Sequence, residues 1–338
     1  MTHFASFKRL LPLMAAMALL AFPAAAQQPT SVNPTASSVN EKQLLDALKP
    51  GSTDTVSGRI SIQDARAGNL IQPAGKEFRA FHEETLPLVG KIAILGTLAA
   101  LVLFYMFRGR IRIEAGLSGR RILRFGNFDR FIHWTTATSF LALGLSGLNL
   151  VFGKSLLLPI LGPDVFSSIT QAGKFVHNYV SFAFALGITL MFLAWLKDNF
   201  PGIIDVRWAL QGGGIIGSKH PPADRFNGGQ KLIFWTTMLG GIALSVSGYI
   251  MMFRPNDILI SGFQLATVVH GLTGLIMFAV IIAHIYIGTV GMEGAFDAMG
   301  RGDVDLNWAK EHHGVWVDKV ALKRPQDISS SRAFTPAE

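Results

Sequence analysis

The chain has 338 residues, of which 50% are hydrophobic and only 15% are charged. Soluble domains carry about 25% charged residues, so this composition excludes an ordinary soluble protein. Cysteine is absent, which excludes disulfides, cysteine-bound iron–sulfur clusters and the Cys-x-x-Cys-His attachment of a c-type haem. The net charge of +8 does not indicate nucleic-acid binding, because the basic residues flank apolar runs as they do in membrane proteins.

The N-terminus has the pattern of a secretory signal peptide over residues 1–26. Two basic residues precede an apolar stretch from Leu10 to Phe22, and three alanines follow as small residues at a cleavage site. A retained anchor is the alternative, but about 13 apolar residues are short for a membrane span. We therefore expect the mature chain to begin near Gln27, outside the cytoplasm.

Residues 27–86 are polar and form a predicted exported segment. They carry one short helical pattern from Glu41 to Leu48 and three turn signals, Asn33-Pro34, Lys49-Pro50-Gly51 and Pro73-Ala74-Gly75. No residue in this segment indicates chemistry. Two roles stay open for it, a contact surface for a partner and a simple tether.

Five apolar segments are long enough to cross a bilayer, which takes about 20 residues, so the chain is predicted to be an all-α membrane protein. They cover residues 87–107, 131–152, 171–196, 231–253 and 263–290. The first is an additional N-terminal span, and the other four fall within residues 131–290. A basic loop at residues 108–130 and a tail at residues 291–338 complete the predicted organisation.

The distribution of basic residues predicts the orientation of these spans. The loop at 108–130 carries seven of them, Arg108, Arg110, Arg112, Arg120, Arg121, Arg124 and Arg130. The loop after the third span has Lys197, Arg207, Lys219 and Arg225, and the tail has Arg301, Lys310, Lys319, Lys323, Arg324 and Arg332. The other two connections carry only Lys154, Lys174 and Arg254. The positive-inside rule then predicts a cytoplasmic tail, in agreement with the signal peptide.

Four of the nine histidines lie within the apolar segments: His133, His177, His270 and His284. Ionisable groups inside a membrane usually face a bundle interior, a partner or a cofactor. For one such histidine, a hydrogen bond to a neighbouring helix would be an equally good interpretation. A set of four favours a shared function.

The predicted topology sorts these histidines into two pairs. His270 and His284 are 14 residues apart, so on one helix they lie about 21 Å apart and close to the same face. His133 is at the cytoplasmic start of its span, level with His284, and His177 is at the outer start of its span, level with His270. Two histidines at each of two depths suit axial ligation of two stacked b-type haems.

The remaining histidines are predicted to be solvent-exposed. His82 lies in the exported segment, His220 precedes two prolines in a loop, and His312 and His313 lie among charged residues of the tail. His3 belongs to the signal peptide.

Small residues accompany the candidate ligands. They are Gly144, Gly147, Gly240, Gly241, Gly271 and Gly274. They would leave room for a macrocycle between helices, and close helix packing is the equally common alternative.

Three motifs and a tail piece occur in the order of a known family. They are Phe128-Asp129-Arg130-Phe131-Ile132-His133-Trp134-Thr135, the loop Arg225–Lys231 followed by Phe234-Trp235, the His270-to-His284 spacing, and Trp308–His313. With these the region from residue 120 to about 317 resembles the cytochrome b (gamma) membrane subunit of respiratory formate dehydrogenase. The resemblance implies a four-helix dihaem cytochrome b bundle, here with one extra N-terminal transmembrane helix.

The resemblance also implies roles for individual residues. His177 and His270 would hold the outer of two b haems, and His133 and His284 the inner one. A quinone would bind beside the inner haem at a loop that here contains Asn227, Gly229 and Gln230, together with His284. On its own, the Asn-Gly-Gly sequence would be interpreted as a turn.

The expected partners follow from the family. A catalytic molybdenum or tungsten subunit would oxidise formate outside the cytoplasm, an iron–sulfur subunit would relay electrons, and quinone would be reduced at the cytoplasmic side of a bacterial inner membrane. This chain lacks the cysteines for clusters. The signal peptide, the exported segment and the span at 87–107 depart from the core of the family. This span carries no predicted ligand and would dock a subunit or anchor the segment before it.

Two other classes of protein are compatible with the sequence. A dihaem cytochrome b that serves a hydrogenase or a sulfur-compound reductase would share the four histidines. A proton-coupled transporter would also place histidines in spans, but the sequence shows neither membrane-embedded acidic partners nor an inverted repeat. A purely structural membrane anchor would leave four buried histidines without a role.

Overall fold

The computed structural model describes residues 73–214, 221–255, 257–323 and 328–329. The chain divides into two units, Met1–Lys76 and Glu77–Glu338, and the second is described below. The predicted signal peptide, the helical pattern at Glu41–Leu48 and His220 lie outside the described residues.

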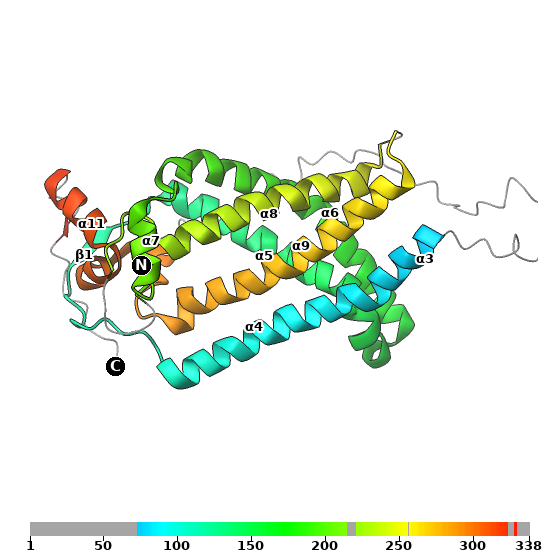
Figure 1. The fold of residues 1–338 in the computed structure, drawn as a ribbon, viewed down its shortest axis with the longest axis horizontal. Coiled ribbons are helices and arrows are strands. Elements are labelled where there is room, and N and C mark those ends of the chain that lie inside the picture. The colour runs from blue at the N-terminus through cyan, green and yellow to red at the C-terminus, as the bar shows by residue number, and fades with distance from the viewer. Residues whose placement is uncertain (1–72, 215–220, 256, 324–327, 330–338) are drawn as a thin grey trace, which may run out of the picture. The chain divides into compact units, whose positions relative to one another are not determined.

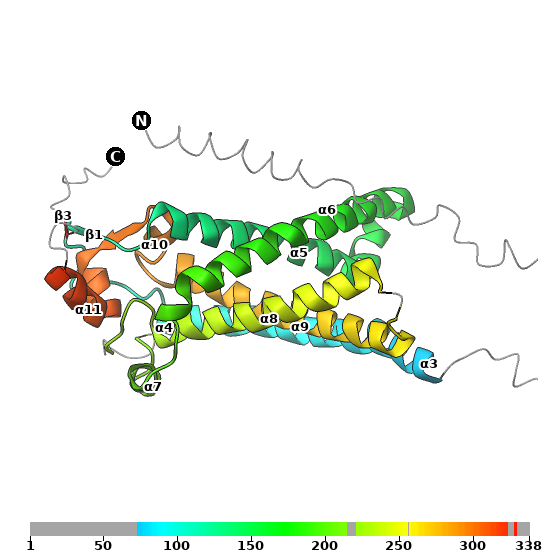
Figure 2. The same cartoon turned by 90° about the horizontal axis from the view of Figure 1, so that it is seen from above.

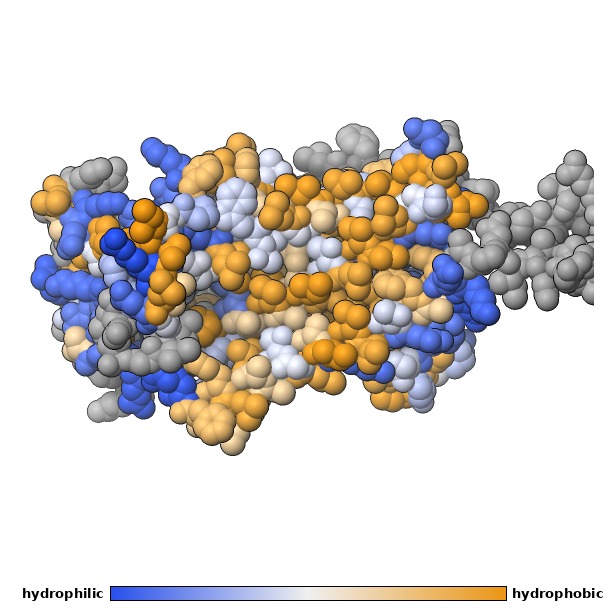
Figure 3. Space-filling view, in the orientation of Figure 1, coloured by the Kyte–Doolittle hydropathy of each residue, from blue (hydrophilic) through white to orange (hydrophobic). Residues whose placement is uncertain are grey.

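Five helices among the described residues are long and apolar enough to cross a membrane. They contain α4 (Leu86–Arg108), α5 (Asn127–Leu156), α6 (Leu158–Trp195), α8 (Gly228–Phe253) and α9 (Ile260–Tyr286). These helices run alongside one another in Figures 1 and 2. The surface along them is mainly hydrophobic, and hydrophilic side chains gather at the two ends, as Figure 3 shows. The prediction of an all-α membrane protein is confirmed.

The N-terminal span is part of the helix bundle. Helix α4 packs along α9 (Figure 1), where the buried Leu86 contacts Gly271 and a Cβ at the buried Gly90 would meet Phe152 and Leu275. The absence of side chains at these glycines lets the two helices approach closely. The helix begins earlier than expected, with α3 (Pro73–Ala80) and a π-helical turn (Phe81–Thr85) in front of it. Proline suits the first turn of a helix, so the turn predicted at Pro73 is wrong.

The connection between the second and third spans is also helical. Only Leu157 separates α5 from α6, and α6 bends at Gly162 and Pro163. Gly162 has a φ of 76°, which glycine adopts without strain, and proline cannot continue the hydrogen bonding of the preceding turn. The apolar pattern did not predict this piece, because Pro163, Asp164 and Ser167 interrupt the apolar run.

A small cap closes one end of the bundle. We call residues 109–126 and 292–323 the cap; it contains β1 (Arg121–Leu123), α10 (Asp297–Gly300), β2 (Asp303–Asp305) and α11 (Leu306–Lys323). Strand β1 pairs antiparallel with β2 and with β3 (Ile328–Ser329), which gives the order β2-β1-β3. The sequence did not predict this sheet. The basic loop and the tail were expected to be separate, but they fold together.

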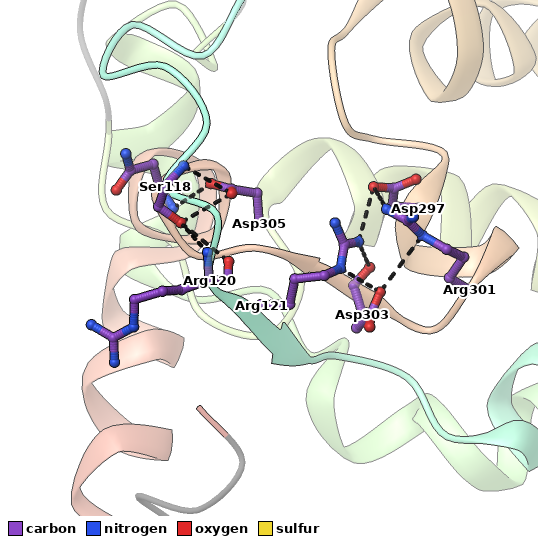
Figure 4. Close-up of polar contacts among 8 residues, drawn as sticks. Ser118, Arg120, Arg121, Asp297, Arg301, Asp303 and Asp305 are labelled. Atoms are coloured by element: carbon purple, nitrogen blue, oxygen red, sulfur yellow. Dashed lines mark hydrogen bonds and ion pairs between the residues drawn. The ribbon is translucent and has the colours of Figure 1, made fainter. Parts of the chain in front are cut away.

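Ion pairs and backbone bonds join the two parts of the cap (Figure 4). Arg121 bridges Asp297 at 2.9 Å and Asp303 at 2.8 Å, and the carboxylate of Asp305 accepts bonds from the backbone and hydroxyl of Ser118. Arg121 therefore has a structural role besides any effect of the basic loop on orientation.

Candidate functional site

The structure brings the four intramembrane histidines together in two cross-helix pairs. His133 on α5 faces His284 on α9 with ring centroids 6.3 Å apart, and His177 on α6 faces His270 on α9 at 6.0 Å. The His133–His284 pair is at the cap end of the bundle, and the other pair is toward the opposite end. Because α9 is continuous from Ile260 to Tyr286, the spacing of 14 residues separates the pairs by about 21 Å.

Both separations fit two imidazoles that share one metal ion. Metal–nitrogen bonds to histidine are about 2 Å long, and the ring adds about 1 Å on each side, so centroids about 6 Å apart leave room for an iron between them. Among the described residues, no group of three or more His, Asp or Glu could hold a metal ion. Two-histidine ligation is therefore the arrangement that these side chains offer.

Hydrogen bonds orient the pair at the far end from the cap. His177 Nδ1 lies 2.9 Å from Ser146 Oγ, and His270 Nδ1 lies 3.1 Å from both Ser247 Oγ and the Leu244 carbonyl. A carbonyl oxygen only accepts, so His270 carries its proton on Nδ1. Each serine donates its own hydroxyl to the preceding turn of its helix and can accept from the imidazole. This leaves Nε2 of each ring as the unprotonated nitrogen that binds metal.

The pair at the cap end has no corresponding hydrogen bond among the described residues. His133 Nδ1 is buried and has no hydrogen-bond partner among the described residues. A buried polar nitrogen without a partner is unfavourable.

Two glycines lie directly against the imidazoles. A Cβ at Gly147 would be 3.6 Å from His177, and one at Gly248 would be 3.1 Å from His270. The other glycines near the ligands serve helix packing: Gly144 contacts Phe278, Gly240 contacts Met277, Gly241 contacts Ile188 and Phe184, Gly271 contacts Leu86 and Gly274 contacts Leu244. Ser146, Ser247 and Gly248 were not predicted, because each lies on a different helix from the histidine that it contacts.

Aromatic side chains fill the space between the two pairs. Phe278 lies between His270 and His284 along α9, and its ring stacks on Phe140 at 6.5 Å. Phe140 also contacts Phe184 at 6.0 Å. This apolar layer lies between the two levels.

The Asn-Gly-Gly-Gln loop forms the N-terminus of α8. Asn227 Oδ1 accepts from the backbone N–H of Gln230 at 2.9 Å, and Gln230 Oε1 accepts from that of Asn227 at 3.2 Å. This reciprocal capping box replaces the turn that the sequence alone indicated. Backbone N–H groups only donate, so both side-chain oxygens are used. Neither NH₂ group has a hydrogen-bond partner among the described residues, so each can donate to a ligand. Gly229 lets the ring of Trp208 approach, since a Cβ there would be 3.0 Å from it.

A buried arginine connects this loop to the cap. Arg124 Nη2 donates to the Arg225 carbonyl at 2.7 Å, lies 3.4 Å from Gln230 Oε1 and 3.0 Å from His313 Nε2. Its guanidinium lies over the rings of Phe125, Trp308 and Trp316 at 5.1, 5.6 and 5.1 Å. Such cation–π contacts stabilise this cation, for which the described part of the chain supplies no carboxylate partner. Burial lowers the pKa of Arg124 to about 9, with a smaller effect of Arg225.

The prediction that His312 and His313 are solvent-exposed is wrong. Both are buried, and His313 is 1% exposed. Its Nδ1 lies 2.8 Å from the Asp224 carbonyl, and its Nε2 faces Arg124. Burial and then the charge of Arg124 hold the pKa of His313 well below its usual value. His82, in contrast, is exposed as expected.

The motif around His133 also fixes the cap to the bundle. Arg130 donates to the carbonyls of Met299, Gly300 and Arg301, and the indole of Trp134 donates to Met299. Asp129 accepts from the Trp195 indole at 2.6 Å and from Arg225 at 3.3 Å. The non-histidine residues of this motif therefore hold the start of α5 in place.

Comparison with known proteins assigns the family. Residues 124–302 match the family described as prokaryotic cytochrome b561, and because this is just over half of the chain, the protein belongs to that family. It is thus an integral membrane cytochrome that binds haem b, in agreement with its five apolar helices.

Curated relatives are subunits of one kind of enzyme. The chain is 28% identical over 217 residues to the nitrate-inducible formate dehydrogenase cytochrome b556(Fdn) subunit of Escherichia coli K12, which covers 62% of this chain and 97% of the relative. It is 28% identical to the formate dehydrogenase cytochrome b556(fdo) subunit of the same strain, covering 59% and 93%. The formate dehydrogenase cytochrome b556 subunit of Haemophilus influenzae is 27% identical, covering 63% and 90%.

Proposed function

We propose that this protein is the membrane cytochrome b subunit of a formate dehydrogenase complex, with two b haems and a quinone site. The observation that carries the proposal is the presence of two cross-helix histidine pairs, 6.0 and 6.3 Å between centroids, at two levels of one bundle. The names of the curated relatives supply the donor, formate. Formate oxidation itself takes place on a catalytic molybdenum or tungsten subunit, and an iron–sulfur subunit joins it to this chain.

Different side chains would bind the haem at each of the two levels. His177 and His270 hold the outer haem, and His133 and His284 hold the inner one. When bound, the two haems supply one-electron transfer between the two faces of the membrane. Ser146 and Ser247 keep the outer imidazoles in the tautomer that ligates iron, and Phe140 and its aromatic neighbours form the apolar layer between the levels.

The capping box prepares a site for a hydrogen-bond acceptor. Asn227 and Gln230 have used their oxygens within the box, so they offer NH₂ donors, which suit the carbonyl oxygens of a quinone. Gly229 is the third residue of this loop, and His284 completes the site from α9. The chemistry of the loop thus agrees with quinone reduction beside the inner haem.

The orientation follows from charge. The cap carries most of the basic loop and the described part of the tail, so it lies in the cytoplasm, and the mature N-terminus lies in the periplasm. Moving one electron inward against a negative-inside potential requires about 2.3 kcal/mol per 100 mV. Quinone reduction with cytoplasmic protons would therefore conserve energy across the membrane.

A reduced-minus-oxidised spectrum of the purified complex tests the proposal, with haem measured per chain and formate as reductant. We expect two b haems per chain, both reduced by formate. Two haems that dithionite reduces but formate does not would point to a hydrogenase or a sulfur-compound reductase as the complex. One haem per chain would contradict the ligand pairs.

A further inference from the structure

Helix α7 (Ile203–Leu210) lies crosswise to the spanning helices. It is seen from its side in Figure 1 and along its axis in Figure 2, at the cap end of the bundle where α8 begins. It follows the third span directly, after the short turn Leu196–Asp198. A helix placed across the end of a membrane bundle has the orientation of a helix that lies in the bilayer surface.

The outward face of α7 is apolar. Ile203, Val206 and Leu210 are 74%, 60% and 83% exposed, and their spacing of three and four residues puts them on one stripe. Figure 3 shows hydrophobic surface over this helix beside a strongly hydrophilic patch. The exposed Arg207 lies at the edge of the stripe. In water, such a face would be unfavourable on an eight-residue helix.

This face continues the membrane-facing surface of the bundle. Phe200 precedes α7, and Leu232 lies on the first turn of α8, with both side chains largely exposed. Phe200 also contacts Trp235 of α8. The apolar surface therefore extends from α8 onto α7 without leaving the bundle, which favours lipid over a separate protein as its occupant.

The inward face of α7 holds the Asn227–Gln230 loop. Asp205 forms a buried ion pair with Lys231 at 2.8 Å, and Lys231 also donates to the Phe200 carbonyl. The ring of Trp208 lies against Gly213, Gly228 and Gly229, where a Cβ would come within 2.8 to 3.0 Å of it. The same short helix thus contacts both the apolar surface and the loop that offers amide donors.

We infer that α7 lies in the inner membrane interface, with Ile203, Val206 and Leu210 in lipid, and that a long-tailed quinone reaches the Asn227–Gln230 loop from the bilayer beside α7. Arg207 at the edge of the stripe suits anionic lipid headgroups. Trp208 packs against the loop at Gly228 and Gly229. The quinone part of this inference rests on the proposed function; the lipid part does not.

Photolabelling tests the lipid contact on the unmodified complex. The complex is placed in vesicles that contain a phospholipid with a diazirine near the middle of an acyl chain, irradiated, and analysed by mass spectrometry of its peptides. We expect adducts on residues 203–210 at a level similar to Leu239, an exposed residue within α8, and none on Leu322, an exposed residue of α11. Absence of adducts on residues 203–210, because water or a protein covers them, would overturn the inference.

Steady-state kinetics with quinones test whether the quinone reaches the loop from the bilayer beside α7. Val206→Gln and Leu210→Gln should raise the KM for a long-tailed quinone several-fold, and they should leave the KM for a short-tailed water-soluble analogue and the rate of haem reduction by formate unchanged. Ile160→Gln, at an exposed residue of α6, is the matched control. An unchanged KM for the long-tailed quinone in both variants would overturn the route. If the unsubstituted complex reduces neither quinone, the proposed function fails, and the photolabelling still decides the position of α7.

Discussion

Arg124 and His313 meet inside the cap, where Nη2 of the arginine lies 3.0 Å from Nε2 of the histidine. The two residues come from opposite ends of the bundle sequence, and both are buried. Because Nδ1 of His313 faces a carbonyl oxygen, it is the protonated nitrogen, and Nε2 accepts from the arginine. The contact joins the loop before α5 to α11 and requires a neutral imidazole.

This contact predicts acid sensitivity of the cap. The pKa of His313 is well below its usual value because of burial, so between about pH 6.5 and that lowered pKa the unfolded chain binds a proton that the folded cap does not. The stability of the cap should fall by up to about 1.4 kcal/mol per pH unit below about pH 6.5. Hydrogen exchange of α11 at pH 5.5 and 7.5 measures the loss. His313→Gln should reduce this pH dependence and His82→Gln should not; equal slopes in all three proteins would contradict the assignment.

Removing one ligand of the cap-end pair should remove one haem. His284→Ala leaves His177 and His270 in place, so we expect one of two b haems to remain, with a single midpoint in a potentiometric titration. His82→Ala is the control at an exposed histidine and should retain both. Two intact haems in His284→Ala would show that this residue is not a ligand.

The hydrogen bonds from the outer histidines to serine should affect the midpoint potential of the outer haem. Ser146→Ala removes an acceptor for the Nδ1 proton of His177, which makes the imidazole less basic and favours reduced iron. We expect a rise of the outer midpoint potential on the order of 40 mV, which corresponds to about 1 kcal/mol for one electron. Ser155→Ala, at an exposed serine bonded to its own helix, is the control. A shift of the inner midpoint alone would reverse the assignment of the two pairs.

Gly248 should tolerate no side chain. In Gly248→Ala the new Cβ would be 3.1 Å from His270, so the imidazole must move, and we expect weaker retention of the outer haem. Gly96→Ala on α4 is the matched control, because a Cβ there meets nothing within 4 Å. It should gain roughly 0.5 to 1 kcal/mol of stability from the lower flexibility of alanine. Haem content per chain after dialysis compares the two variants, and equal contents would contradict the prediction.

Two conservative substitutions distinguish the role of the Asn227–Gln230 loop in capping α8 from its role in binding quinone. Asn227→Asp and Gln230→Glu keep the oxygens that the capping box needs, but each removes an NH₂ donor. We expect quinone reduction to fall about fivefold in each variant, in line with the loss of roughly 1 kcal/mol per hydrogen bond, while haem reduction by formate and thermal stability are retained. Full quinone activity in both variants would place the quinone elsewhere.

Much of the fold was predictable because membrane spans are encoded locally. About 20 apolar residues in a row can only satisfy their backbone groups as a helix, so the five spans could be found from composition alone. The pairing of His133 with His284 and of His177 with His270 could be anticipated as well, since alternating spans fix which residues share a depth. Whether the two rings of a pair face each other, as a shared iron requires, depends on the rotation of each helix about its axis. Only the packing of the helices determines that rotation.

The conformations of the cap and the loops depend on tertiary contacts. The sequence around Arg124 does not predict its burial, because Trp308, Trp316 and His313 lie about 190 residues away in the chain. His313 was predicted to be exposed among the charged residues of the tail for the same reason. The sequence by itself determined the spans and the histidine levels, since hydrophobic length and spacing are local properties. The burial of Arg124 and His313, the donors left at Asn227 and Gln230, and the crosswise position of α7 arose only from contacts between distant segments.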